Sequence, residues 1–198
     1  PFASQRGLGQ DLATHLMNEE DNEYMEVANM RGAIARDLHG AFAEWEAQAH
    51  GLTKCRNYLY SLSINPDQRQ RRLTREEYLA YIDAVEERLG LTGQPRAVVF
   101  HIKQDKDGNA REHCHVVWSR IDAREGKAVH MPFDHDKLMM VTREFAHEHG
   151  LRLPDGYYKD AERKGRQVTL YEQSQQIVTG LTLEERKAVI TQAWKQSD

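Results

Sequence analysis

The sequence contains only two cysteines, Cys55 and Cys114, and neither belongs to a CxxC pair. A disulfide scaffold and a thiolate zinc knuckle are therefore not supported, and both cysteines are expected to be small residues of the core. Long apolar runs are also missing, since segments such as AVVF at residues 97–100 are far too short to span a bilayer, and no basic-then-apolar leader opens the chain. We therefore expect a cytoplasmic protein without membrane insertion.

An excess of positive charge is absent as well, because the 198 residues carry a formal net charge of -4. This balance argues against a protein that holds nucleic acid by bulk electrostatics alone. Local clusters of arginine and lysine nevertheless occur at Arg69, Arg71, Arg72 and Arg75, and again at Lys159, Arg163, Lys164 and Arg166. Such runs are more often solvated surface than a binding site, so a phosphate-contacting face stays open as an alternative.

Helices and strands alternate along the chain. Helical periodicity and capping patterns predict helices over residues 10–20, 33–50, 74–90 and 134–150, and a last helix that opens at Thr182. Short segments rich in apolar and aromatic residues predict strands over residues 24–30, 57–65, 96–102 and 113–121. The last two strands are joined by a hairpin turn, so the expected fold is an α/β domain of the α+β type, with a mainly antiparallel sheet flanked by helices.

The stretch EHCHVVWSRID places His113 and His115 on either side of Cys114. Side chains alternate along a strand, so the two histidines point to one face and the cysteine to the opposite, packed face. His101 ends the neighbouring strand and joins this face only if it pairs with His113 or His115. A two-residue turn would place it opposite Cys114 instead, so the pattern predicts an odd-length turn or a bulge.

Three neutral imidazoles on one face can hold a divalent metal and leave coordination positions open. A structural zinc site is normally closed by four protein ligands, whereas an open three-histidine site suits catalysis. A single histidine here would more often be a hydrogen-bonded surface residue. Because His101, His113 and His115 share the face of one predicted hairpin, we favour a metal site.

The helix DLATHLM, the strand YLYSLSIN, and FH followed by HCHVVWSRI together resemble the conjugative relaxases, plasmid mobilisation nucleases of the MOBP-like, histidine-hydrophobic-histidine type. The resemblance runs from about Gly9 to Gly150. It implies a palm-like sheet that binds single-stranded DNA at a plasmid transfer origin, with Mn²⁺ or Mg²⁺, or alternatively Zn²⁺, on the scissile phosphate. By position, the metal ligands are His101, His113 and His115, and Ser63 of the central strand orients the DNA or the active site.

The resemblance also implies an organisation and a set of partners. Residues 1–153 are expected to form the relaxase catalytic domain, and residues 154–198 a basic linker and C-terminal helix that start a longer chain. The expected partners are the transfer-origin strand, accessory relaxosome proteins and a type IV coupling protein, and the domain is expected to be a monomer.

The expected nucleophile departs from the better-known relaxase pattern, in which a tyrosine of the first helix attacks the phosphate. The matching helix has no tyrosine and carries His15 at that position, while Tyr24 follows nine residues later. A neutral imidazole attacks phosphorus without a separate base, whereas a tyrosine of ordinary pKa, about 10, must first lose its proton. We predict His15 as the nucleophile and Tyr24 as the alternative.

The function implied is nicking of one strand at a transfer origin by transesterification, with a covalent protein-5′-phosphate intermediate that allows rejoining. Two alternatives remain. One is a noncatalytic DNA-binding module of a mobilisation or replication complex, in which the metal is structural. The other is a rolling-circle replication initiator with the same metal site and a different DNA target.

Overall fold

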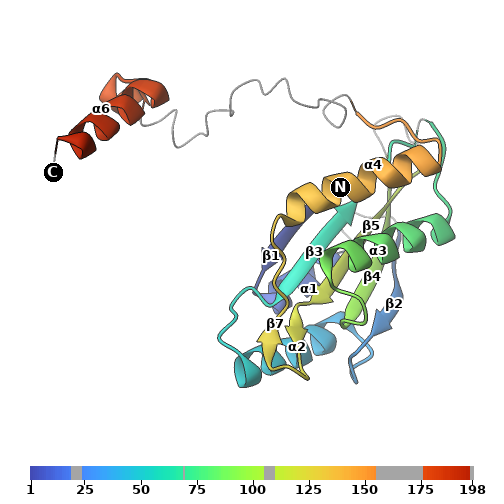
Figure 1. The fold of residues 1–198 in the computed structure, drawn as a ribbon. Coiled ribbons are helices and arrows are strands. Elements are labelled where there is room, and N and C mark those ends of the chain that lie inside the picture. Colours follow the sequence, from blue (N-terminus) through green and yellow to red (C-terminus); the bar gives the residue numbers. More distant parts are fainter. Residues whose placement is uncertain (19–23, 69, 105–109, 155–175, 197–198) are drawn as a thin grey trace. The chain divides into compact units, whose positions relative to one another are not determined.

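The computed structural model describes residues 1–18, 24–68, 70–104, 110–154 and 176–196 (Figure 1). The chain divides into two compact units, Pro1–Pro154 and Asp155–Asp198. The second contains α6 (Leu183–Lys195), where Thr182 and Glu185 form the expected reciprocal cap, with hydrogen bonds of 2.7 and 3.2 Å. Arg69, Glu19, Glu20 and residues 155–167 of the expected basic linker lie outside the described residues.

The first unit is built on a five-stranded sheet. Its strands are β1 (Phe2–Arg6), β2 (Tyr24–Arg31), β3 (Leu59–Ile64), β4 (Arg96–Gln104) and β5 (Ala110–Ser119). They lie in the order β1-β3-β5-β4-β2, and every neighbouring pair is antiparallel. A separate two-stranded ribbon follows, formed by β6 (Ile121–Asp122) and β7 (Lys127–Ala128). The expectation of an antiparallel sheet flanked by helices is confirmed.

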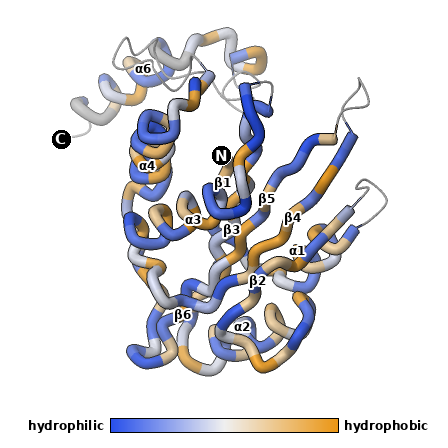
Figure 2. The backbone as a smooth tube through the Cα atoms, turned by 90° about the vertical axis from the view of Figure 1, so that its right-hand side faces the viewer, coloured by the Kyte–Doolittle hydropathy of each residue, from blue (hydrophilic) through white to orange (hydrophobic). Residues whose placement is uncertain are grey.

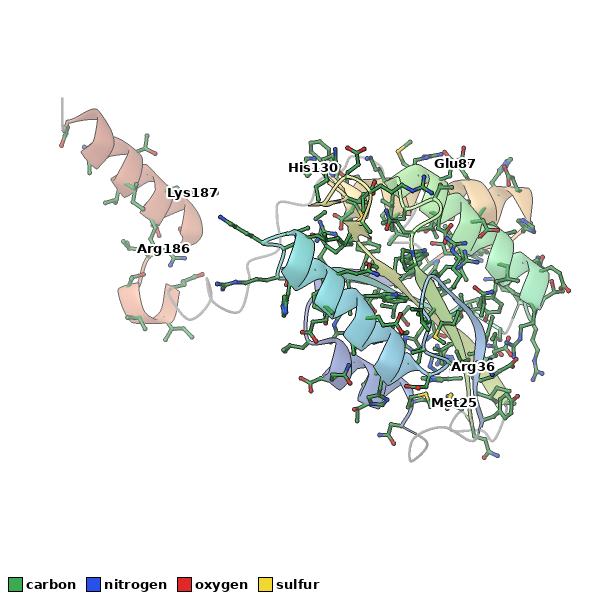
Figure 3. All side chains as sticks on the ribbon, turned by 90° about the horizontal axis from the view of Figure 1, so that it is seen from below. Met25, Arg36, Glu87, His130, Arg186 and Lys187 are labelled. Atoms are coloured by element: carbon green, nitrogen blue, oxygen red, sulfur yellow. The ribbon has the colours of Figure 1, made fainter. Side chains whose placement is uncertain are left out.

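Four helices cover the two faces of the sheet (Figures 1 and 3). They are α1 (Gly9–Leu16), α2 (Leu38–Leu52), α3 (Arg75–Leu89) and α4 (Asp134–Glu148). Buried residues of α1 and α2 pack with Ala97, Val99 and Val117 of the sheet, and those of α3 and α4 pack with Val98, Phe100 and Cys114. Because neighbouring residues of a strand point to opposite faces, residue parity along β4 and β5 decides which helical layer a side chain meets.

The ends of the helices follow local capping chemistry. α3 begins at the predicted capping box, in which Thr74 Oγ1 accepts from the Glu77 N–H at 3.2 Å and Glu77 accepts from the Thr74 N–H at 2.8 Å. It ends at Gly90, whose φ of 72° favours glycine. At α4 the N-cap is Phe133, which makes no side-chain capping hydrogen bond, and Asp134 is the first helical residue.

The prediction of a helix from residue 33 is wrong. α2 begins only at Leu38, because the Asp37 side chain accepts from the Gly40 N–H at 2.8 Å and caps the helix there. In the preceding segment, the Glu44 carboxylate accepts hydrogen bonds from the Ile34 and Ala35 N–H groups at 2.8 and 2.7 Å, which stabilises a non-helical conformation there. Ile34, which lies at helical spacing from buried Leu38 in the sequence, is 93% exposed.

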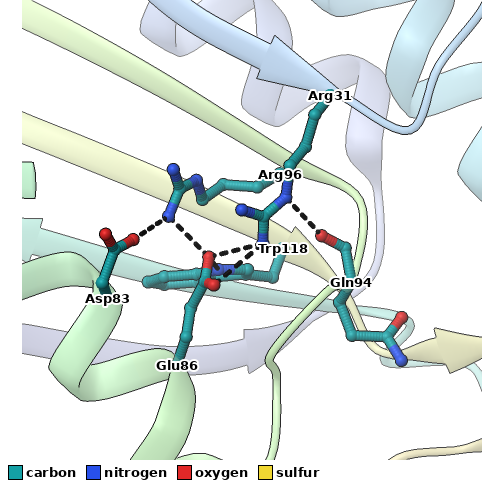
Figure 4. Close-up of polar contacts among 6 residues, drawn as sticks. All are labelled: Arg31, Asp83, Glu86, Gln94, Arg96 and Trp118. Carbon is teal, nitrogen blue, oxygen red and sulfur yellow. Dashed lines mark hydrogen bonds and ion pairs between the residues drawn. The ribbon is translucent and has the colours of Figure 1, made fainter.

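A buried ionic network ties the end of β2 to α3 and to the middle of the sheet (Figure 4). The Glu86 carboxylate accepts from Arg31 at 2.8 Å, from Arg96 at 2.7 Å and from the Trp118 indole N–H at 2.7 Å. Arg96 also donates to Asp83 at 2.8 Å. Because the partners come from β2, α3, β4 and β5, the network helps to fix how these elements meet.

Candidate metal centre

The pairing of β4 with β5 places the three histidines on one face. His101 lies directly opposite His113, and Val99 lies opposite His115. The predicted register is therefore confirmed. Cys114 pairs with Phe100 and is buried in the core under α3 and α4, so the cysteine occupies the opposite face, also as predicted.

The three rings form a compact triangle. The ring centroids are 5.1 Å apart for His101 and His113, 5.0 Å for His101 and His115, and 5.1 Å for His113 and His115. One nitrogen of each ring lies within 4.8 Å of the others, and among the described residues this group contains neither a carboxylate nor a thiolate. Three imidazole donors, without a fourth ligand from the described part of the chain, fit a divalent metal that keeps positions open for substrate oxygens.

Burial keeps these imidazoles neutral. Desolvation is the main cause that lowers the pKa of His113 to about 4 and of His115 to about 3, and it also lowers the pKa of His101. The charges of the neighbouring histidines and of Lys103 add to the effect. A neutral imidazole has a lone pair for a metal, so the environment favours the ligand form at physiological pH.

Helix α1 touches this cluster through its last residue. The Nε2 atom of His101 lies 2.8 Å from the carbonyl oxygen of Leu16, and His101 is 4% exposed. Histidines that bind metals commonly donate their second ring N–H to such a carbonyl, which fixes the orientation of the ring. The end of α1 and the histidine cluster are therefore one local structure.

His15 precedes Leu16 in the last turn of α1 and is exposed. Leu12, His15 and Leu16 recur at helical spacing in the sequence, but only the two leucines are buried, each 1% exposed. The charge of His15 lowers the pKa of both His101 and His115, so its ring lies within electrostatic reach of the cluster. An exposed imidazole beside the three histidines is available to a substrate.

Tyr24 lies at the start of β2 and is 50% exposed. It pairs with Ile102, whereas the next residue, Met25, pairs with His101. Because paired residues share a face and consecutive residues alternate, Met25 points to the histidine side and Tyr24 to the other side of the sheet.

Ser63 lies on β3 directly opposite His115 and shares its face. It is partly buried and pairs on its other side with Phe2 of the edge strand β1. The strand that carries Ser63 is second in the sheet and not central, a position that β5 occupies.

Two basic residues beside the histidines were not predicted as site residues. Lys103 and Arg111 pair with each other two residues beyond the pair of His101 and His113. The alternation that brought the histidines together also places these cations on the same face. The sequence signal was present, because each cation lies two positions from a histidine on its own strand.

No helix within the described residues is both long and apolar enough to cross a membrane. Comparison with curated proteins and with solved structures found no match to the chain. The family model for relaxases, described as MobA/VirD2-like, nuclease domain, matches residues 12–151 of the 198. This range contains the three clustered histidines, His15, Ser63 and the whole of the five-stranded sheet except β1. The chain therefore belongs to the MobA/VirD2-like relaxase family and carries its nuclease domain.

Proposed function

We propose that this protein is a metal-dependent DNA relaxase that nicks one strand at a plasmid transfer origin and remains joined to the 5′ phosphate. The observation that supports the proposal is the contact between the last residue of α1, Leu16, and His101, together with the exposure of His15 in the same helical turn. The proposed metal ligands are His101, His113 and His115, and the proposed metal is Mn²⁺ or Mg²⁺, with Zn²⁺ as the alternative. The bound ion would supply Lewis-acid activation of a nonbridging phosphate oxygen.

In the proposed reaction, a neutral ring nitrogen of His15 forms a bond to phosphorus in line with the 3′ oxygen, and the P–O3′ bond breaks. The ring N–H proton passes through solvent to the departing oxygen, which leaves as a 3′ hydroxyl. The product is a phosphoramidate to the 5′ end of the strand. In the reverse step the 3′ hydroxyl attacks the phosphorus, the P–O3′ bond forms, the P–N bond breaks and the hydroxyl proton returns to the imidazole through solvent, so rejoining needs no nucleotide cofactor.

Ser63 would orient the DNA or the ring of His115, since the two residues are direct neighbours on adjacent strands. Tyr24 is the alternative nucleophile, but its strand position turns it away from the histidine face. We further propose that residues 1–153 act as the catalytic domain, and that accessory relaxosome proteins and a type IV coupling protein are its partners.

The decisive experiment incubates the protein with a single-stranded transfer-origin oligonucleotide and Mn²⁺ and looks for a protein-DNA adduct that survives denaturation. We expect an adduct from the wild type and from Tyr24→Phe, and none from His15→Ala or after chelation of the metal. His39→Ala is the matched control, because His39 lies on α2 and contacts Thr14 of α1, 3.1 Å away. A phosphoramidate adduct should also hydrolyse in acid, whereas a phosphotyrosyl adduct largely survives.

If His15→Ala still forms the adduct and Tyr24→Phe does not, Tyr24 is the nucleophile. No adduct from the wild type on a cognate origin with metal present would favour the noncatalytic DNA-binding module. Cleavage of a replication origin in preference to a transfer origin would favour the rolling-circle initiator.

A further inference from the structure

Two cations face each other beside the candidate metal centre. Lys103 of β4 and Arg111 of β5 are direct cross-strand partners, next along the strands from the pair of His101 and His113. The spacing of two residues along a strand is about 6.6 Å. Because side chains alternate along each strand, Lys103 and Arg111 lie on the same face as the three histidines.

This pair of cations lacks an anionic partner in the described part of the chain. Arg111 donates to the Asn65 side-chain oxygen at 3.2 Å, and no carboxylate forms an ion pair with Arg111 or with partly buried Lys103. Like charges directly opposite each other destabilise a sheet. The arrangement therefore has an electrostatic cost that an anion between the two side chains would relieve.

The opposite face of the same strands carries a cation that does have carboxylate partners. There, Arg75 lies 2.9 Å from the carboxylate of Glu112 and 3.4 Å from that of Glu26, and its guanidinium stacks 3.5 Å from the centroid of the Phe100 ring. Among the described residues, Arg75 on the α3 side is therefore paired with carboxylates, whereas Lys103 and Arg111 on the histidine side are not. Figure 2 shows that β4 and β5 become hydrophilic toward these ends.

We propose that Lys103 and Arg111 bind backbone phosphates of the single strand next to the phosphate at the histidine cluster, and so position the scissile bond. The inference rests on the proposed function and adds two positioning residues to it. A flexible ammonium and a guanidinium are the side chains that most often contact phosphates. Such contacts fix the register of a strand without reading its bases, so this pair would act on any sequence.

The test measures the affinity of a fluorescent single-stranded oligonucleotide at several salt concentrations, with the metal chelated. Each phosphate contact on a single strand contributes about 0.7 to the slope of log K against log salt, so Lys103→Gln with Arg111→Gln should lower the slope by about 1.4. Lys103→Arg keeps the charge and should keep the slope. The matched control is Arg124→Gln with Lys127→Gln, exposed cations of the β6–β7 ribbon, which should leave the slope unchanged.

A second measurement separates phosphate binding from a structural role. Removal of two facing cations should leave the thermal midpoint unchanged or higher, whereas loss of a structural pair would lower it. An unchanged salt slope in the double variant, or an equal loss in the control, would overturn the inference. Adduct formation tests the proposed function independently. If the wild type forms adducts and the double variant keeps the wild-type salt slope, only this inference is wrong. If the wild type forms no adduct and the salt slope of the double variant falls, only the proposed nicking reaction is wrong.

Discussion

The Nε2 atom of His101 lies 2.8 Å from the main-chain oxygen of Leu16, so the last carbonyl of α1 holds a ring of the histidine cluster. A carbonyl oxygen only accepts hydrogen bonds, and Nε2 must therefore carry the proton. The lone pair then resides on Nδ1. This contact also joins the helix of the proposed nucleophile to the strand of a proposed metal ligand, although they lie 85 positions apart in the sequence.

The first prediction concerns this tautomer. In the metal-free protein at neutral pH, His101 should be the Nε2–H form, because that form alone makes the bond to Leu16. Long-range proton–nitrogen correlation spectra distinguish the two tautomers directly. Exposed His130 serves as the internal reference for a ring in solvent. A protonated Nδ1 at His101 would mean that the contact with α1 does not exist in solution.

The second prediction concerns metal affinity. Calorimetric titration of the chelator-treated protein with Mn²⁺ should show one site, and His113→Gln should weaken binding by more than about 100-fold. Loss of a group that only orients a ligand costs roughly 10–100-fold, so loss of a ligand should exceed that range. His130→Gln removes an exposed histidine and should bind as the wild type does. Equal affinity of His113→Gln and wild type would place the metal elsewhere.

The faces of the site residues on the strands could be predicted more accurately than the surrounding helices, because strand alternation is a strict rule. Alternation alone predicted that His113 and His115 share one face and that Cys114 lies on the other, whereas the face of His101 depended on the register of the hairpin. The exposure of His15 did not follow, since a helical face is broad and the tertiary contact of Leu16 decides which side of α1 packs. Helical periodicity also predicted that α2 begins at residue 33. The side-chain cap of Asp37 starts the helix later, and periodicity does not take capping into account.

Long-range partners were the other part that the sequence did not reveal. β1 (Phe2–Arg6) has little apolar content and becomes a strand by pairing with β3. Glu86 falls on the buried side of α3, where a carboxylate alone would be costly, and only the fold shows that Arg31 and Arg96 meet it. Local sequence patterns do not predict contacts between residues that lie far apart in the chain.

The third prediction tests that network. Glu86→Gln keeps the size of the side chain and an acceptor for the Trp118 N–H, but it leaves Arg31 and buried Arg96 without their shared carboxylate. Removing one partner of a buried ion pair costs about 3–5 kcal/mol, so the free energy of unfolding should fall by that order. Glu87→Gln, on the exposed neighbour, should change it little. Urea unfolding measures both. Equal stability of the two variants would show that the network contributes nothing.

The fourth prediction concerns the start of α3 and its response to acid. Hydrogen bonds from Arg71, at 2.6 and 2.8 Å, are the main cause that lowers the pKa of Glu77 from 4.5 to about 2, followed by the Thr74 N–H. A carboxylate with a depressed pKa stabilises the fold above its ordinary pKa, and this contribution is lost as pH falls from 4.5 toward 2.

Glu77→Gln keeps the capping hydrogen bond but loses the charge. The variant should therefore be less stable than the wild type at pH 7, by about 1 kcal/mol or less because the pair is partly exposed, and the difference should shrink steadily below pH 4.5. Urea midpoints at pH 7, 5, 4 and 3 measure it. Arg71→Gln should show a similar loss at pH 7 and a similar convergence in acid, since it removes the same pair from the other side. A difference between wild type and Glu77→Gln that stays constant from pH 7 to pH 3 would mean that the ion pair with Arg71 does not form in solution.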